Sequence, residues 1–157
     1  MSGDELRYLT RAIELAAAAR EHGNHPFGSL LVDGDGTILL EAENTVVTGN
    51  DVTAHAELNL VRTASTRFDV EALRGSTLYT STEPCAMCSG AIFWSGIGRV
   101  VFALSSEQLM GIVRDDSGSF TLALSCREVF ARGGRDVKVS GPHVTEQAAM
   151  VHDGFWG

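Results

Sequence analysis

Residues 53–57 read Thr-Ala-His-Ala-Glu, and residues 83–88 read Glu-Pro-Cys-Ala-Met-Cys. Each stretch begins a segment whose residue pattern predicts a helix, so its reactive side chains stand at a helix N-terminus. Pro84 suits such a start, because its missing N–H has no intrahelical acceptor there. Cys85 and Cys88 are three residues apart and therefore share one face of the first turn. Together the two stretches offer an imidazole, two thiols and two carboxylates.

His55, Cys85 and Cys88 form a ligand set that suits zinc. Helix N-termini carry positive potential, which favours the thiolate over the thiol. Two thiolates and one imidazole leave the fourth tetrahedral position open for a water, whose pKa zinc lowers toward about 7. Glu57 follows His55 by two residues, so it can reach the same cavity without being a ligand and can move protons there. We therefore expect one Zn²⁺ with Glu57 as the catalytic residue.

Each stretch alone has a simpler interpretation. A lone His-x-Glu is usually part of a helix surface, and a lone Cys-x-x-Cys is also typical of a redox pair. A structural zinc site would need a fourth protein ligand; His25 or Cys126 could be nominated, but neither has the spacing of a motif. His-x-Glu followed by Pro-Cys-x-x-Cys is the signature of zinc nucleobase deaminases. The joint pattern favours hydrolytic deamination over the redox and structural alternatives.

The order of predicted elements indicates an α/β fold with a sheet covered on both faces. The first two strands flank residues 33–36, Asp-Gly-Asp-Gly, which is a hairpin signal and predicts an antiparallel pair. The segment between the last two strands includes a helix and is long enough for a crossover, so these strands should be parallel. Helices are expected at 4–22, 54–65, 84–95 and 143–153, strands at 27–33, 37–42, 76–80, 99–104 and 136–140, and partly helical chain at 105–135.

Length and charge narrow the classes of protein. The 157 residues suit one domain spanning 1–157, and 12 basic against 20 acidic residues give a formal charge of −8. A nucleic-acid partner usually needs a basic face, and Lys138 is the single lysine, so such a partner is disfavoured. No run of 18 apolar residues predicts a membrane span. The first five residues do not read as a signal peptide, so we expect a cytoplasmic protein.

These motifs resemble the cytidine-deaminase-like superfamily, in the branch that holds bacterial guanine deaminases, fungal-type cytosine deaminases and tRNA adenosine deaminases. The resemblance spans about residues 5–112 and includes 26–28, 50–57, 78–88 and 90–94. It implies a three-layer α/β/α sandwich with a five-stranded mixed sheet, and a homodimer whose partner chain shapes the active site.

The same resemblance, strongest to guanine deaminases, implies a reaction. Zinc-activated water would deaminate a purine-type nucleobase or related 2-amino heterocycle and release ammonia. Cytosine, isocytosine or a nucleoside is the alternative substrate. A tRNA adenosine deaminase should carry basic residues near its C-terminus, where 136–157 has Lys138 as its one lysine, so that reading is less favoured.

Candidate substrate-binding residues follow from the resemblance. Asn44 corresponds to an Asn that hydrogen-bonds the base, and Phe27 to an aromatic residue that stacks on it. The backbone N–H of Ala56 is a candidate donor to a ring carbonyl, because first-turn amides lack intrahelical acceptors. His25 could add a polar contact at the pocket mouth. Trp94 is either a pocket wall or a packing residue.

The C-terminal third is less well defined. Asp115 and Asp116 stand near the place of an acidic pair in guanine deaminases, but Val-Arg at 113–114 precedes them where an aromatic residue would be expected. A solvated turn is the alternative for this segment. Phe155 and Trp156 form an aromatic pair near the end of the sequence that is costly to leave in water. In the family that the chain resembles, C-terminal aromatic residues close over the bound base, so the resemblance implies this role for the pair. Plain packing is the alternative.

Four further titratable residues stand in no motif. His22, His143 and His152 are therefore expected at the surface. Cys126 is expected to be a buried core thiol.

Overall fold

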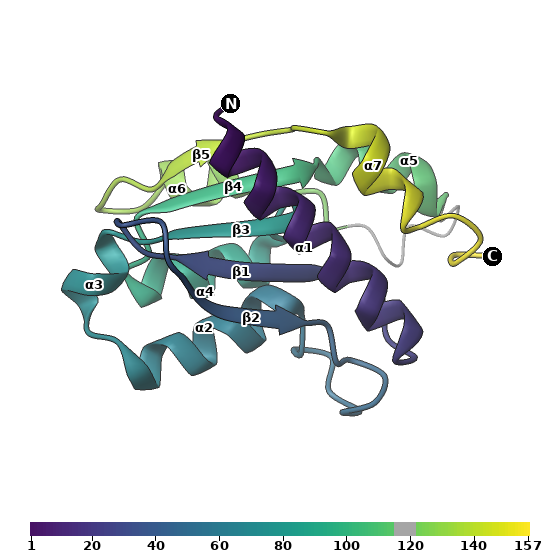
Figure 1. The fold of residues 1–157 in the computed structure, drawn as a ribbon, viewed down its shortest axis with the longest axis horizontal. Helices are drawn as coiled ribbons and strands as arrows, with labels where there is room; N and C mark the ends of the chain where they lie inside the picture. Colours follow the sequence, from purple (N-terminus) through teal and green to yellow (C-terminus); the bar gives the residue numbers. More distant parts are fainter. Residues whose placement is uncertain (115–121) are drawn as a thin grey trace.

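The computed structural model describes residues 1–114 and 122–157. Its centre is a five-stranded mixed sheet in the order β2-β1-β3-β4-β5 (Figure 1). β1 is antiparallel to both β2 and β3, whereas β3, β4 and β5 are parallel. This confirms the expected α/β fold, the antiparallel hairpin and the parallel last pair. The strands are β1 (Gly28–Val32), β2 (Ile38–Glu43), β3 (Thr77–Thr82), β4 (Arg99–Leu104) and β5 (Lys138–Ser140).

Helices cover both faces of the sheet, and each face has its own apolar cluster. α1 and α7 pack on one face around residues such as Leu9, Leu30 and Ala148. α2, α4 and α6 cover the other face around Leu60, Ile92 and Phe130, and Figure 1 shows them behind the sheet. The helices are α1 (Gly3–Glu21), α2 (Ala56–Arg67), α3 (Val70–Arg74), α4 (Ala86–Ser95), α5 (Ser106–Val113), α6 (Cys126–Ala131) and α7 (Thr145–Met150).

α1 packs directly on β1. Ser2 caps the helix, since its hydroxyl accepts from the Glu5 amide and the Glu5 carboxylate accepts from the Ser2 amide. A Cβ on Gly28 would lie 2.5 Å from the Leu15 Cβ and 2.6 Å from the Ala12 carbonyl oxygen. Glycine at this position therefore allows the close approach of α1 to β1.

The parallel strands set the location of the site. β3 and β4 run in register from Thr77 opposite Arg99 to Thr82 opposite Leu104, so their carboxyl ends reach the same edge of the sheet. The amide of Glu83 continues this pairing by donating to the Leu104 carbonyl over 2.7 Å. Ligand sites of open α/β sheets form at this edge, where the chain leaves the strands.

One short helix departs from the expectation of a loop after residue 65. α3 forms because the Asp69 carboxylate accepts from the Ala72 amide over 2.8 Å and because Leu73, 2% exposed, packs into the core. Five residues are too few to show a helical period in the sequence. In the described part of the chain, no helix is both long and apolar enough to cross a membrane.

Candidate active site

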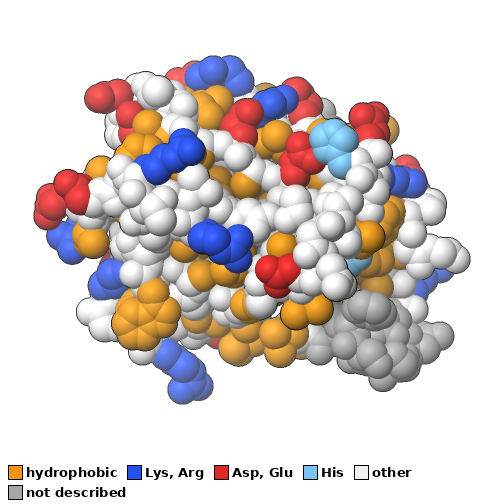
Figure 2. All heavy atoms as spheres, turned by 90° about the horizontal axis from the view of Figure 1, so that it is seen from below, with side chains coloured by type: hydrophobic (Ala, Val, Ile, Leu, Met, Phe, Trp, Pro, Cys, Tyr) orange, Lys and Arg blue, Asp and Glu red, His pale blue; other side chains and the backbone are white. Residues whose placement is uncertain are grey.

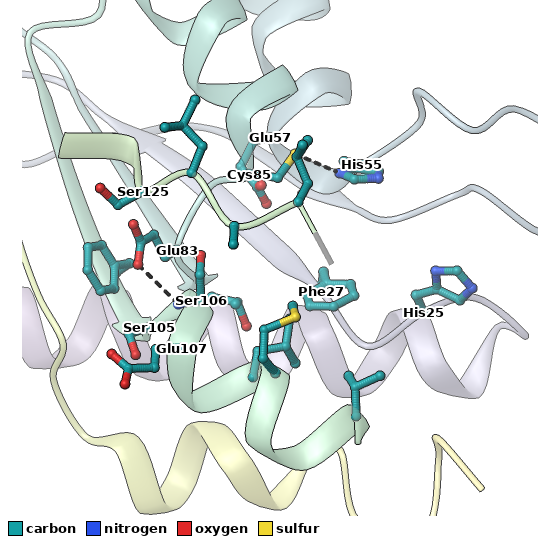
Figure 3. A pocket seen from close by; sticks show the side chains of 18 of the residues that line it. His25, Phe27, His55, Glu57, Glu83, Cys85, Ser105, Ser106, Glu107 and Ser125 are labelled. Atoms are coloured by element: carbon teal, nitrogen blue, oxygen red, sulfur yellow. Dashed lines mark hydrogen bonds between the residues drawn. The ribbon is translucent and has the colours of Figure 1, made fainter. Parts of the chain in front are cut away.

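A cavity of about 760 Å³ lies at the carboxyl ends of β3 and β4. Figure 3 shows His55, Glu57 and Cys85 at one side of it, near Phe27, with His25 further along. Volumes of this size are typical of small-molecule sites. Its described lining is His25, Phe27, Val46, Val52, His55, Glu57, Thr82, Glu83, Cys85, Phe102, Ser105, Ser106, Glu107, Leu109, Met110, Val113, Leu122, Ala123, Leu124, Ser125, Arg127, Glu128, Pro142 and Trp156.

The two motifs meet as their spacing predicts. His55 is the N-cap residue of α2, Cys85 is the N-cap residue of α4, and Cys88 lies one turn further along α4. Nδ1 of His55 is 3.6 Å from the Cys85 sulfur and 3.5 Å from the Cys88 sulfur. The three ligand atoms all lie within 4.8 Å of one another.

This donor set fits a tetrahedral zinc ion. Zn–S bonds of about 2.3 Å and Zn–N bonds of about 2.0 Å place sulfur and nitrogen about 3.5 Å apart. A hydrogen bond with the Cys88 thiol, and then the His55 imidazole, lower the pKa of Cys85 to about 4. The same contact and burial raise the pKa of Cys88. Two neighbouring thiolates are mutually repulsive, and a divalent cation between them offsets that repulsion.

Glu57 stands beside the ligand cluster on the first turn of α2. Its side chain lines the cavity, yet the residue is 6% exposed. Oε1 accepts a hydrogen bond of 3.1 Å from the hydroxyl of Thr80 on β3. Burial, followed by the charge of the Cys85 sulfur, raises the pKa of Glu57 to about 7. The carboxylate is therefore fixed in place without belonging to the His-Cys-Cys group.

Glu83 anchors the loop that presents Cys85, a role that the sequence analysis did not identify. Its carboxylate accepts from the Ser106 amide over 3.0 Å and from the Cys126 amide over 2.9 Å. These amides belong to the first turns of α5 and α6, so one side chain ties both helices to the loop that carries Cys85. Figure 3 draws the bond to Ser106. An acidic residue directly before Pro84, at the start of the Cys-x-x-Cys helix, was the signal available in the sequence.

Comparison with known proteins decides the family. The family model of the cytidine and deoxycytidylate deaminase zinc-binding region matches residues 2–104. The chain belongs to this deaminase family. With the His-Cys-Cys group in place, the family supports one Zn²⁺ per deaminase subunit.

The relatives of this deaminase act on different bases. It is 43% identical over 157 residues to a probable cytosine deaminase of Schizosaccharomyces pombe, covering 99% of this chain and 94% of that protein. It is 40% identical over 111 residues to a guanine deaminase of Bacillus subtilis, covering 70% of each chain. A solved guanine deaminase from Nitrosomonas europaea superposes with a TM-score of 0.75 at 25% identity, covering 96% of this chain and 82% of that one.

The structure brings some of the expected substrate residues to the cavity of the deaminase and leaves others away from it. His25, Phe27 and Trp156 belong to its described lining. Burial, and then the charge of His55, lower the pKa of His25. Trp94 is 84% exposed and is not among the described lining residues. Its indole instead packs edge-on against Phe93, with 5.2 Å between ring centroids.

Asn44 and Ala56 are not among the described lining residues of the cavity. Asn44 is 1% exposed, and its Oδ1 accepts from the Val46 amide over 3.0 Å. Ala56 begins α2, where the first amides of a helix lack intrahelical acceptors.

The C-terminal aromatic pair folds back onto its own chain. Phe155 packs against Trp156, with 4.8 Å between ring centroids, and Trp156 reaches the cavity. The expectation of a surface position for His152 is wrong: this residue is 2% exposed and packs against Phe27 and Trp156. Cys126 is fully buried, as expected. Asp115 and Asp116 lie outside the described residues.

Proposed function

We propose that this chain is a zinc-dependent aminohydrolase acting on a free nucleobase or a small nucleoside. Water adds to the amine-bearing ring carbon, the carbon–nitrogen bond breaks, and ammonia leaves as the ring carbonyl forms. The observation that carries this proposal is the opening of the His55 and Cys85 side chains and the Glu57 carboxylate into one cavity.

Each residue of the site has a distinct task. His55, Cys85 and Cys88 would hold the metal, which when bound supplies an activated water as nucleophile. Glu57 accepts the proton that this water loses and returns protons to the ring nitrogen and to the departing amine. Its buried position, fixed by the Thr80 hydroxyl, supports this assignment. A proton shuttle of this kind contributes about 10²–10⁴-fold to the rate.

The walls of the cavity suit a flat aromatic ligand. Phe27 and Trp156 provide aromatic surface, with 6.2 Å between their ring centroids, and Leu109 and Met110 add apolar surface. Planar heterocycles pack well against such side chains, while a few polar groups fix their orientation. We assign one such role to the Asn44 NH₂ group, since the Asn44 Oδ1 already accepts from the Val46 amide. Asn44, the Ala56 amide and His25 are the orienting groups in this proposal.

The substrate that we place first is a cytosine-type pyrimidine. The Schizosaccharomyces pombe relative, a probable cytosine deaminase, matches nearly the whole chain, whereas the Bacillus subtilis guanine deaminase matches 70% of it. Because Trp156 lines the cavity, a relative that is similar along the C-terminal segment is the better guide to the base.

Guanine is the second candidate, and the guanine-like substrate expected from the sequence stays a prediction. A cavity of about 760 Å³ has room for a bicyclic purine. The likeness to the guanine deaminase of Nitrosomonas europaea extends over 96% of this chain.

A tRNA substrate is disfavoured on electrostatic grounds. Among the described lining residues, four carry carboxylates and one carries a guanidinium. They are Glu57, Glu83, Glu107 and Glu128, and Arg127. On the face shown in Figure 2, Lys and Arg side chains are scattered among acidic and apolar ones rather than gathered into a patch. RNA binding relies on gathered positive charge.

We further propose a homodimer that uses α4. This helix carries no charged residue between Ala86 and Ser95, and it presents the exposed Trp94. An exposed indole on an uncharged helix suits an apolar contact with a second copy. Sedimentation should show a dimer that Trp94→Glu dissociates; a wild-type monomer at tens of micromolar concentration would contradict the proposal.

Ammonia release against a panel of amino-heterocycles tests the proposed function. The panel comprises cytosine, isocytosine, guanine, adenine, their nucleosides and amino-triazines, each assayed with zinc-loaded protein. We expect the highest kcat/KM with cytosine. A higher value with guanine reverses the ranking, and turnover restricted to tRNA refutes the assignment to small substrates.

A further inference from the structure

Two residues of the C-terminal segment, His152 and Trp156, form a hydrogen bond beside the cavity, and neither has a role in the proposed reaction steps. The indole N–H of Trp156 donates to Nδ1 of His152 over 3.0 Å. The two rings are nearly parallel, with an interplanar angle of 17° and 6.2 Å between their centroids. His152 is 2% exposed, whereas Trp156 is part of the cavity lining. A buried side chain thus fixes the orientation of a residue that lines the cavity.

The hydrogen bond defines the protonation state of His152. An indole N–H can only donate, so Nδ1 accepts and carries no proton. The ring is therefore neutral with its proton on Nε2, an atom that is buried and has no hydrogen-bond partner among the described residues. An unpartnered buried N–H is unfavourable. The hydrogen bond that Nδ1 accepts from Trp156 is therefore what favours an imidazole at this position over an apolar ring.

The backbone on both sides of His152 is fixed by a residue of α1. Nη1 of Arg20 donates to the Val151 carbonyl over 2.9 Å and to the Asp153 carbonyl over 2.7 Å. The Arg20 guanidinium also lies 5.5 Å from the ring centroid of Phe155. Because Arg20 of α1 holds the backbone on both sides of His152, the imidazole is fixed in place and can orient the indole of Trp156.

Aromatic neighbours complete the wall around Trp156. The indole lies 5.6 Å from the His25 ring and 6.2 Å from the Phe27 ring, measured between centroids. The His152 ring meets Phe27 edge-on at 5.5 Å. Since His25 and Phe27 line the cavity too, rotation of the indole would change the space that these side chains enclose.

We propose that His152 is a positioning residue that holds Trp156 as a wall of the cavity and thereby helps to determine which planar heterocycle is accepted. The class of ligand rests on the proposed function; the position of Trp156 does not. Without the hydrogen bond, the indole leaves the wall and substrate loses contact in the ground state and the transition state alike. KM then rises while kcat changes little.

Two substitutions separate the hydrogen bond from packing. His152→Phe keeps a ring and removes the acceptor, whereas His152→Asn removes the ring and keeps an acceptor near the place of Nδ1. Both are made in a Trp94→Phe parent, so that Trp156 is the single remaining indole of the two in the chain. We expect His152→Phe to raise KM roughly 3–10-fold and His152→Asn to stay near the parent. In a Trp156→Phe background, His152→Phe should raise KM no further.

Trp156 fluorescence tests the position of the indole without substrate. Acrylamide should quench the His152→Phe variant more strongly than the parent, and His152→Asn should resemble the parent. Unchanged quenching with unchanged KM in His152→Phe overturns the proposal, as does a loss in His152→Asn as large as that in His152→Phe. If no heterocycle is turned over, the proposed function fails, and the quenching comparison still decides the role of His152.

Discussion

The hydroxyl of Thr80 on β3 donates a hydrogen bond of 3.1 Å to Oε1 of Glu57 on α2. The same hydroxyl lies 3.1 Å from the Thr82 carbonyl oxygen and 3.4 Å from that of Gly28. A single hydroxyl proton cannot serve all three, and an ionised carboxylate is the strongest acceptor. The central strand of the sheet thus sets the direction of the carboxylate that faces the cavity.

Replacing Thr80 by valine should lower kcat by about 10-fold or more, because Glu57 loses the donor that orients it. Valine matches threonine in shape, so the zinc content should stay at the wild-type value. Steady-state ammonia release and metal analysis check both expectations. Thr80→Ser keeps the hydroxyl and should retain most of the activity; equal losses in the two variants would argue against orientation by the hydroxyl.

Loss of one sulfur ligand should remove the metal. Cys88→Ala leaves two of the three ligands, and we expect its zinc content to fall far below one ion per subunit, with activity lost in parallel. Cys126→Ala is the control, because Cys126 is buried away from the His-Cys-Cys group. It should retain zinc even if it is less stable. A Cys88→Ala protein with full zinc content would contradict the ligand assignment.

Glu83→Gln should destabilise the fold. The carboxylate accepts from the first-turn amides of α5 and α6, and an amide group would present N–H against one of these N–H donors. Loss of one such charged hydrogen bond costs about 2–3 kcal/mol. Urea unfolding measures the change in the free energy of unfolding. Glu71→Gln, at a side chain 86% exposed, is the matched control and should change stability by less than about 0.5 kcal/mol.

Acid should weaken the fold through His152. Burial, and then the charge of Arg20, lower the pKa of this residue to about 4, while Asp153 opposes the shift. In the unfolded chain His152 takes up a proton near its ordinary pKa of about 6.5. Its contribution to the free energy of unfolding is therefore complete above that pH and is lost as the pH falls toward 4. Together these values predict a loss of about 3 kcal/mol at most.

Unfolding free energies measured between pH 7 and pH 4 for wild type and His152→Phe check this expectation. The variant should show a flatter pH dependence, because it lacks the buried group that must gain a proton on unfolding. His25, which packs against Trp156, is present in both proteins and cancels in the comparison. Identical pH profiles would show that His152 is not the responsible group.

The pairing of the first two strands, the parallel last pair and the His-Cys-Cys cluster follow from features visible in the sequence. A hairpin signal, a crossover of sufficient length and two helix-starting motifs are local patterns that map directly onto strands and helix N-termini. The structure places Nδ1 of His55 within 3.6 Å of both sulfurs, as the joint motif predicts for one metal site.

The surroundings of the site follow less directly, because they depend on contacts between distant residues. His152 carries no motif, and it is buried because the tail turns back onto α1, where Arg20 binds the carbonyls of Val151 and Asp153. Glu83 accepts hydrogen bonds from the amides of Ser106 and Cys126, which are 23 and 43 residues away in the sequence. No local sequence pattern predicts contacts at that separation. Substrate preference depends on these same tertiary contacts, so the sequence predicts the chemistry more closely than the base.

Ammonia release by zinc-loaded wild type and zinc-loaded Glu57→Gln, with cytosine as substrate, tests the central assignment most directly. The glutamine keeps the shape of the side chain but cannot carry the proton. We predict equal zinc content in the two proteins and a kcat lower by about 10²–10⁴-fold in Glu57→Gln, with guanine substituted if it proves the better substrate. Full turnover by a zinc-loaded Glu57→Gln protein would contradict the account.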